Sequence, residues 1–151
     1  MTKSQASMSP IEVVLALRRI RLFAALAPAD LQRVAEIAKE HTHPDGDVIA
    51  AEGELGEEMH ILLDGTVRVV RGDGETIARR GAGEVVGEMS VITRAPHVAT
   101  LISEGDVRTL HIGYREFEAM VHERPDIALA IMRALAERLG AMITQPIGGR
   151  V

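Results

Sequence analysis

The stretch Arg80–Thr100, RGAGEVVGEMSVITRAPHVAT, is the part of the 151-residue sequence that decides between fold classes. The pair Gly87-Glu88 follows a strand-like run, and a short apolar helix-like turn and a proline-containing loop come after it. Gly81, Gly83 and Gly87 do not form a dinucleotide-binding loop, because their spacing is one residue off G-x-G-x-x-G and no long helix follows. A short helix beginning at Glu88 would instead offer backbone N–H groups to an anion, and Gly87 would let a ligand approach the backbone closely. The stretch therefore predicts an anion-binding turn, with a plain strand-to-helix turn and an exposed carboxylate as the alternative.

Around this stretch the sequence has the pattern of short β-strands. From His41 onward, apolar residues alternate in short runs, and Gly and Asp recur every few residues. Asp64-Gly65 and Gly72-Asp73-Gly74 are predicted to be hairpin turns, because glycine accepts the positive φ angle that tight hairpins require. The last strands are expected at 100–103 and 107–112. Closely spaced short strands of this kind predict a barrel or a sandwich.

Helical spacing surrounds the β region on both sides. Pro28 stands where a first-turn proline would begin a second helix, and Pro125 opens a final one. The order of helices, strands and helices does not match a βαβ fold, so nucleotide-binding schemes that need parallel strands are disfavoured. The predicted fold is mainly β, a jelly-roll barrel with flanking helices. We expect a flexible leader or cloning remnant at 1–9, one domain at 10–143 (helices 10–40, barrel 41–112, C-terminal helices 113–143) and a flexible tail at 144–151.

Composition narrows the function classes. The chain has no Cys, which excludes disulfides, thiolate metal sites and Cys nucleophiles. The net charge is −5, aromatic residues make up 2% of the chain and no basic run occurs, so a nucleic-acid partner is not expected. No apolar stretch approaches the roughly 18 residues that a membrane span needs. The sequence therefore predicts a cytoplasmic protein that does not insert into membranes.

The quoted stretch resembles the phosphate-binding cassette of cyclic nucleotide-binding domains, the sensor domains of Crp/Fnr-type regulators and of protein kinase A regulatory subunits. In that family a pattern like F-G-E-[LM]-[AS]-x-L precedes P-R-[AST]-A-[TS]. The resemblance continues through Pro44–Ile49, Glu52-Gly53, Gly56-Glu57 and the aliphatic residues that lead to Gly65 and Val67. The flanks agree as well, because 22–28 (LFAALAP) resembles the family's L-F-x-x-L-S-P and 123–128 (ERPDIA) resembles its C-terminal helix junction.

The resemblance implies roles for the cassette residues. Glu88 would accept a hydrogen bond from the ribose 2′-hydroxyl of a cyclic nucleotide. Gly87, Met89 and Ser90 would line the phosphate with backbone donors.

His97 is the main departure from the family pattern, which usually has Arg after the cassette proline to pair with the cyclic phosphate. Arg is always charged, whereas His, with a reference pKa of about 6.5, is mostly neutral at pH 7. Either Arg94 replaces the lost charge, or His97 binds as imidazolium and favours acidic pH, or the pocket has changed or lost its ligand. Val98 stands where relatives often have Thr, Ser or Ala, and a hydroxyl there helps to favour guanine, so cAMP is favoured over cGMP. The predicted ligand-binding residues are Gly87, Glu88, Met89, Ser90, Arg94, His97 and Val98.

His41-Thr42-His43 offers an enzyme alternative, a metal-dependent cupin. Asp47 or Glu52 and the distant His111 could complete such a site, but neither spacing matches the cupin pattern well. Two solvated histidines near a helix–strand junction are the favoured interpretation. We therefore expect no metal, no cofactor and no catalytic residue.

The final helix carries the remaining functional hint. Its apolar stripe consists of Ile127, Ile131, Leu135 and Leu139. A stripe of this kind more often packs in the core than forms a dimer interface, so a homodimer is kept as an alternative. The resemblance implies that the C-terminal helices move as a lid and pass that motion to a fused or separate effector. We expect a non-catalytic regulatory domain that binds a cyclic nucleotide weakly or in modified fashion, with a dead pocket on a protein-interaction scaffold as the rival.

Overall fold

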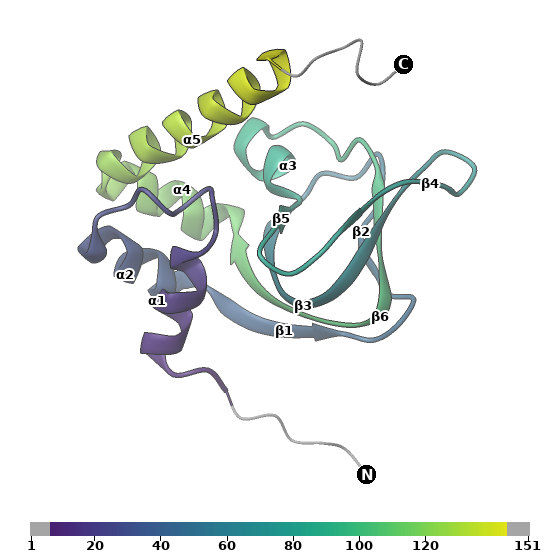
Figure 1. Ribbon diagram of the computed structural model, residues 1–151, viewed down its shortest axis with the longest axis horizontal. Helices are drawn as coiled ribbons and strands as arrows, with labels where there is room; N and C mark the ends of the chain where they lie inside the picture. The colour runs from purple at the N-terminus through teal and green to yellow at the C-terminus, as the bar shows by residue number, and fades with distance from the viewer. Residues whose placement is uncertain (1–6, 145–151) are drawn as a thin grey trace.

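The structure is a computed structural model and describes residues 7–144, so the predicted tail beyond Thr144 lies outside the described residues. Helices α1, α2 and α4 gather at one end of a β barrel, and α5 runs from them towards α3 (Figure 1). The elements in chain order are α1 (Pro10–Arg18), α2 (Pro28–Ile37), β1 (Lys39–His43), β2 (Val48–Ala50), β3 (Glu58–Arg71), β4 (Glu75–Arg80), β5 (Val85–Val86), α3 (Glu88–Thr93), β6 (Thr100–Gly113), α4 (Tyr114–Glu123) and α5 (Pro125–Thr144).

Helix α1 begins with a capping box. The Ser9 hydroxyl accepts a hydrogen bond from the Glu12 backbone N–H at 3.2 Å, and the Glu12 carboxylate accepts one from the Ser9 N–H at 2.8 Å. Pro10 occupies the first turn, where its missing N–H costs nothing. Ser9, which the sequence placed in the leader, is thus the N-cap of the first helix.

The barrel is one six-stranded sheet in which every pairing is antiparallel. The order is β1-β6-β3-β4, with β2 also pairing with β6 and β5 with β3. The two central strands, β3 and β6, are 14 residues long each and pair along most of their length. The predicted jelly-roll barrel with flanking helices is therefore confirmed.

Asp64-Gly65 is not a hairpin turn, contrary to the sequence prediction. Strand β3 continues through it as a bulge, where the register with β6 shifts on both sides of Asp64. Gly65 has a φ of +97°, and a Cβ atom there would lie 2.5 Å from the Asp106 carbonyl oxygen. Glycine is required because β6 passes so close, and a positive φ serves a bulge as well as a turn.

The two runs predicted as separate last strands, 100–103 and 107–112, form the single strand β6. The glycine-rich turn at 72–74 does connect β3 to β4 as predicted, with the Gly74 N–H donating to the Arg71 carbonyl at 3.0 Å. Long strands with a bulge therefore replace some of the expected hairpins.

The apolar side chains form two cores, one on each face of the sheet. The smaller core fills the barrel and includes Leu62, Val67 and Val107. The larger core lies between the outer face of β3 and β6 and the helices α1, α2, α4 and α5, with Phe23 at 0% exposure. Because both terminal helical segments share this second core, the helices are held against the barrel.

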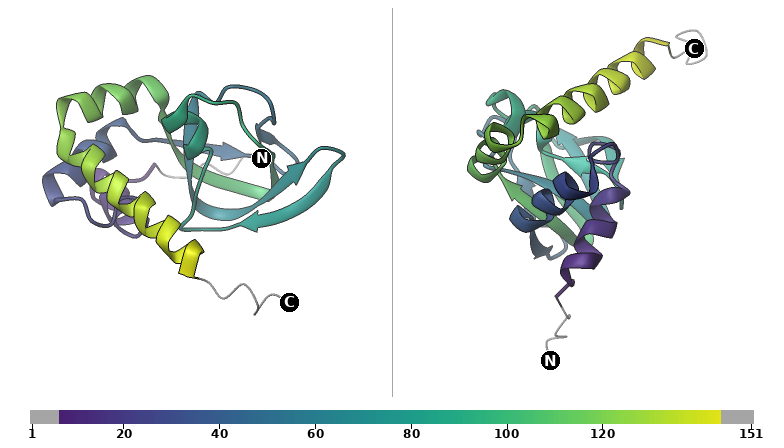
Figure 2. Two further views of the ribbon diagram at one scale, coloured as in Figure 1. Left: turned by 90° about the horizontal axis from the view of Figure 1, so that it is seen from above. Right: turned by 90° about the vertical axis from the view of Figure 1, so that its left-hand side faces the viewer.

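Helix α5 contributes apolar side chains to the larger core only as far as Leu135. Ile127 and Ile131 are buried in the larger core, whereas Leu139 is 59% exposed. The second half projects along the edge of the domain (Figure 2). The predicted stripe is therefore core at its beginning and exposed at its end. Among residues 7–144, no helix combines the length and the apolar character that crossing a membrane requires.

Candidate functional site

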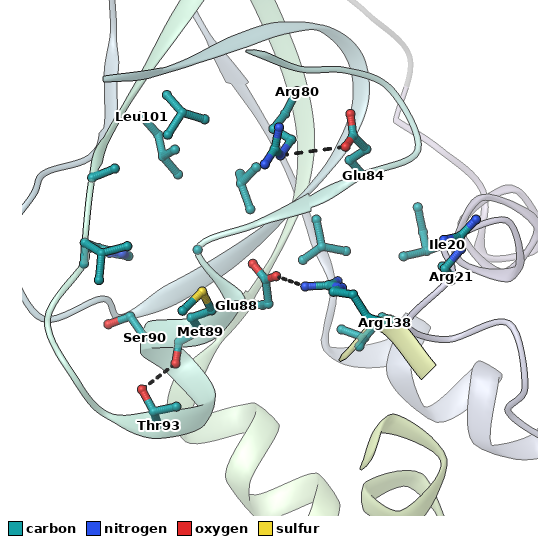
Figure 3. Close-up of a pocket in the computed structure, with 18 of the residues that line it drawn as sticks. Ile20, Arg21, Arg80, Glu84, Glu88, Met89, Ser90, Thr93, Leu101 and Arg138 are labelled. Carbon is teal, nitrogen blue, oxygen red and sulfur yellow. Dashed lines mark hydrogen bonds and ion pairs between the residues drawn. The ribbon is translucent and has the colours of Figure 1, made fainter. Parts of the chain in front are cut away.

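A pocket with a volume of about 730 Å³ opens between the cassette, the barrel and α5 (Figure 3). This size lies in the usual range for small-molecule sites, about 300–1,000 Å³. Six of the seven predicted site residues line it: Gly87, Glu88, Met89, Ser90, His97 and Val98.

Gly87 forms the turn from β5 into α3. Its φ of +77° is left-handed, and a Cβ atom there would lie 3.2 Å from the Glu58 carbonyl oxygen, so only glycine fits without strain. No side chain caps α3 at this end. The first backbone N–H groups of α3 are thus not engaged by a capping side chain, and they stand at the pocket.

Glu88 connects the cassette to the C-terminal helix. Its carboxylate is 9% exposed, and its Oε2 accepts a hydrogen bond from Arg138 Nη1 of α5 at 3.0 Å, which Figure 3 draws as a dashed line. Arg138 was not predicted from the sequence because it lies 50 residues beyond Glu88, and only the path of α5 brings the two together. An ion pair across the pocket therefore ties α5 to the residue that the resemblance assigns to ribose.

Ser90 and Met89 differ in their surroundings. The Ser90 hydroxyl is buried, accepts a hydrogen bond from the Gly56 N–H at 2.7 Å and donates one to the Ala95 carbonyl at 2.6 Å. This hydroxyl holds the loop before β3 against the cassette. Met89 is exposed at the pocket.

His97 lies on the pocket wall with its ring over Gly56. A Cβ atom at Gly56 would be 2.6 Å from the ring, so this glycine provides the space that the imidazole occupies. Burial lowers the pKa of His97 below its usual value, while the Glu54 carboxylate acts in the opposite direction. The imidazole is therefore neutral at pH 7 when the pocket holds no anion. Val98, beside it, is 67% exposed.

Arg94 is not among the residues that line the pocket. Its Nη1 donates to the Gly56 carbonyl at 2.8 Å, and its guanidinium lies 3.5 Å from the centre of the Tyr114 ring. Arg94 ends α3 in a left-handed conformation, with a φ of +58°, and these contacts hold its side chain. The side chain of Arg94 is therefore held away from the pocket, where it was predicted to replace the charge that His97 lacks.

Other cations stand at the pocket that the sequence did not single out. Arg80 of β4 lies on the wall with its Nε 3.8 Å from Glu84 Oε1. Arg19 and Arg21, from the turn after α1, also line the pocket. Their positions depend on how that turn meets the barrel, which no local pattern indicates.

The histidines expected to be solvated are not alike. His41 is exposed, but His43 is 5% exposed and its Nδ1 lies 2.7 Å from Asp47 Oδ2. Glu52 is engaged elsewhere, since its carboxylate accepts the Gly72 N–H. His111 stacks on His41 at 5.6 Å between ring centres. The expectation of two solvated histidines was wrong for His43, because it pairs with the buried Val107 of β6 beside the barrel core.

The fold and the pocket together are those of a small-molecule-binding domain built on a jelly-roll barrel. A family model described as cyclic nucleotide-binding domain matches residues 40–124. The chain belongs to this family, and we describe it as a cyclic nucleotide-binding regulatory domain.

Two relatives illustrate the range of proteins that carry such a domain. The chain is 29% identical over 122 residues to the cyclic AMP receptor protein of Thermus thermophilus, covering 78% of this chain and 56% of that protein. It is 33% identical over 111 residues to lysophospholipase NTE1 of Candida albicans, covering 68% of this chain but 8% of that protein. The chain thus spans only part of the length of these relatives. The expectation that this chain has no nucleic-acid partner does not apply to longer proteins that contain such a domain.

A solved structure agrees with this assignment. The N-terminal domain of a transcriptional regulator from Streptomyces coelicolor A3(2) matches with a TM-score of 0.75 and 30% identity, over 84% of this chain and 94% of that one. The regulatory domain of Toxoplasma gondii PKA, crystallised with cAMP, has the same fold, with a TM-score of 0.74 at 18% identity.

Proposed function

We propose that the pocket binds cAMP in preference to cGMP, with modest affinity, and that binding is transmitted through α5 to a fused or separate effector. The observation that carries this proposal is the ion pair between Glu88 and Arg138. It places the cassette carboxylate and the C-terminal helix in one contact at the pocket. A ligand that engages Glu88 would therefore act on α5 directly.

The ribose would bind at Glu88. Arg138 occupies Oε2, and no residue among 7–144 forms a hydrogen bond with Oε1. A 2′-hydroxyl can donate to that oxygen, and the contact competes with or supplements the ion pair. Either way the free energy of the Glu88–Arg138 contact changes on binding, which is the requirement for a ligand to shift the position of α5.

The phosphate would meet the N–H groups of Gly87 and of the first turn of α3, with His97 beside them. A neutral imidazole offers one donor and no charge, unlike the guanidinium usual in the family. Arg94 is held by Gly56 and Tyr114, so it supports no phosphate contact. These features favour weaker binding than a cassette with arginine would give.

The base would lie against Val98, an exposed apolar side chain without a hydroxyl. This surface supports adenine over guanine. Val98→Thr is expected to increase the affinity for cGMP relative to cAMP by a few-fold, as one neutral hydrogen bond is worth about 1 kcal/mol. An unchanged ratio in the folded variant would refute the assigned position of the base.

Isothermal titration of cAMP and cGMP into the domain tests the pocket. Glu88→Ala is expected to weaken cAMP binding about 10-fold to 100-fold, since a hydrogen bond to a charged group is worth about 1.5–3 kcal/mol. Glu118→Ala removes the same charge from an exposed position on α4 and should change nothing. Equal affinities in the two variants would refute the site. No binding of either nucleotide at millimolar concentration would favour the scaffold instead.

A further inference from the structure

Four histidines from three strands form a closed ring of side chains in the barrel wall, which we call the histidine cluster: His41, His43, His60 and His111. The centres of neighbouring imidazoles are 4.4 Å apart for His41–His43, 5.6 Å for His43–His60, 6.2 Å for His60–His111 and 5.6 Å for His111–His41. Positive charges at such separations repel each other, and they do so most strongly where water is excluded. The cluster is therefore stable only while most of its imidazoles are neutral.

The strand register explains why these side chains meet. His60 on β3 is the direct partner of His111 on β6, and His111 is the direct partner of Lys39 on β1. Because partners across antiparallel strands share a face, and alternate residues of one strand share a face, His41 and His43 lie on the same side as the other two. The partner of His43 on β6 belongs to the smaller core. The cluster therefore continues the apolar interior of the barrel with ionisable rings.

His60 is the member of the cluster that is least able to carry a charge. Its residue is 5% exposed, and its Nδ1 is buried and makes no hydrogen bond with any residue among 7–144. Nε2 of the neighbouring His43 is buried without a partner as well. Burying a charge without a partner is costly, so a proton on His60 would destabilise the folded domain. Burial and the neighbouring histidines accordingly lower the pKa of His60 to about 3.

The ionisable groups around His60 do not neutralise such a charge. They are the other three histidines of the cluster, His97, Lys39 on β1, and the carboxylates of Asp47, Glu54, Glu57 and Glu58. Asp47 Oδ2 lies 2.7 Å from His43 Nδ1, and Glu58 Oε2 lies 3.1 Å from His111 Nδ1. These two carboxylates favour protonation of the neighbouring rings rather than of His60. Each protonated neighbour then adds to the repulsion that a charge on His60 would meet.

The cluster lies directly behind the cassette. His60 is the direct partner of Val86 on β5, a strand of two residues that pairs with β3. A Cβ atom at Gly87 would lie 3.8 Å from His60 Cδ2. The turn from β5 into α3 therefore rests on the His60 ring, and a change in the packing of that ring reaches the cassette.

We propose that the histidine cluster makes the domain acid-labile, so that a fall in pH from 7 to 5 opens the barrel wall behind the cassette. The opened or unfolded chain takes up a proton at His60 below a pKa of about 6.5, whereas the folded domain does so only near 3. Stability is therefore lost as the pH falls through about 6.5. His60 alone should raise the unfolding constant about 25-fold between pH 7 and pH 5. The pocket would be lost in acid, since the cassette rests on the wall that opens.

Urea unfolding at pH 7 and at pH 5, followed by far-UV circular dichroism in the absence of nucleotide, tests this proposal. The quantity compared is the ratio of the two unfolding constants. His60→Phe keeps an aromatic ring that takes up no proton, so its ratio should be about 25-fold smaller than that of the unmodified protein. His122→Phe, at an exposed position on α4, is the matched control and should keep the unmodified ratio. A ratio is insensitive to any change in stability that a substitution causes equally at both pH values.

NMR titration of the histidine rings in the unmodified protein decides the case whether or not His60→Phe folds. The ring protons of His60 in the folded domain should keep the chemical shifts of a neutral imidazole down to pH 5. A His60 ring that titrates near pH 6.5 in the folded domain would overturn the proposal. So would equal ratios in His60→Phe and His122→Phe, or an unmodified protein that is as stable at pH 5 as at pH 7. None of these measurements includes a nucleotide, so they do not depend on whether the pocket binds cAMP.

Discussion

Replacing His97 by Arg is expected to strengthen cAMP binding about 30-fold. In the unoccupied pocket the imidazole is neutral, because burial lowers its pKa. Arg94, which the sequence offers as an alternative phosphate partner, is held by Gly56 and Tyr114. Removing one partner of a buried, hydrogen-bonded charge pair costs about 2–5 kcal/mol, part of which is the penalty of leaving the other charge unpaired. We take about 2 kcal/mol because His97 is only half-buried, and that value corresponds to about 30-fold.

Titration calorimetry at pH 7.5 measures this gain. His122→Arg is the matched control, since it makes the same substitution at an exposed position on α4. A general electrostatic attraction would strengthen binding in both variants, whereas a phosphate contact would strengthen it only in His97→Arg. The ring of His97 now packs over Gly56, so an extended arginine would leave that space and enter the open pocket.

Unchanged affinity in a folded His97→Arg variant would refute the assigned phosphate position. Equal gains in the two variants would refute the direct contact. Circular dichroism and thermal unfolding would establish that both variants fold.

Three other predictions follow from the same geometry. A bound phosphate should raise the pKa of His97 from its lowered value, so that binding takes up a proton. The affinity for cAMP should therefore increase as the pH falls from 8 towards 6. An affinity that does not depend on pH would refute this role of His97. Gly87→Ala should lower the free energy of unfolding in urea by about 2 kcal/mol, because the φ of Gly87 is +77°. Gly81 has open space around it and no positive φ, so Gly81→Ala should change that free energy by less than about 0.5 kcal/mol. Equal effects of the two substitutions would contradict the strained turn at Gly87. Arg138→Gln should speed amide hydrogen exchange in the second half of α5 about fivefold, because a partly exposed ion pair is worth about 1 kcal/mol. Arg133→Gln, at an exposed position on the same helix, should leave the exchange rate unchanged. Unchanged exchange in both variants would mean that the ion pair does not hold α5.

Local signals in the sequence predicted the features that depend on neighbouring residues. The Gly87-Glu88 turn, the short helix after it and the glycine turn at 72–74 lie where their own residues require them. Asp64-Gly65 misled because a glycine with positive φ serves a bulge as readily as a hairpin, and only the approach of β6 distinguishes the two.

The rest of the site depends on residues far apart in the sequence. Arg138 reaches Glu88 across 50 positions, and no pattern within α5 marks it. Arg94 is turned away by Tyr114, twenty positions later. His43 is buried because β1 pairs with β6, a register that the sequence does not reveal. Tertiary packing, not local preference, decided each of these.

The larger core also has a consequence for synthesis of the chain. It contains Val13 near the beginning of the domain and Ile131 in α5, with β3 and β6 between them. A chain that emerges from the ribosome can pair β3 with β6 once residue 113 is free, but the outer face of that sheet stays uncovered until α5 follows. The nascent barrel therefore exposes apolar surface until α5 has emerged, and during that interval association with other chains or with chaperones competes with folding.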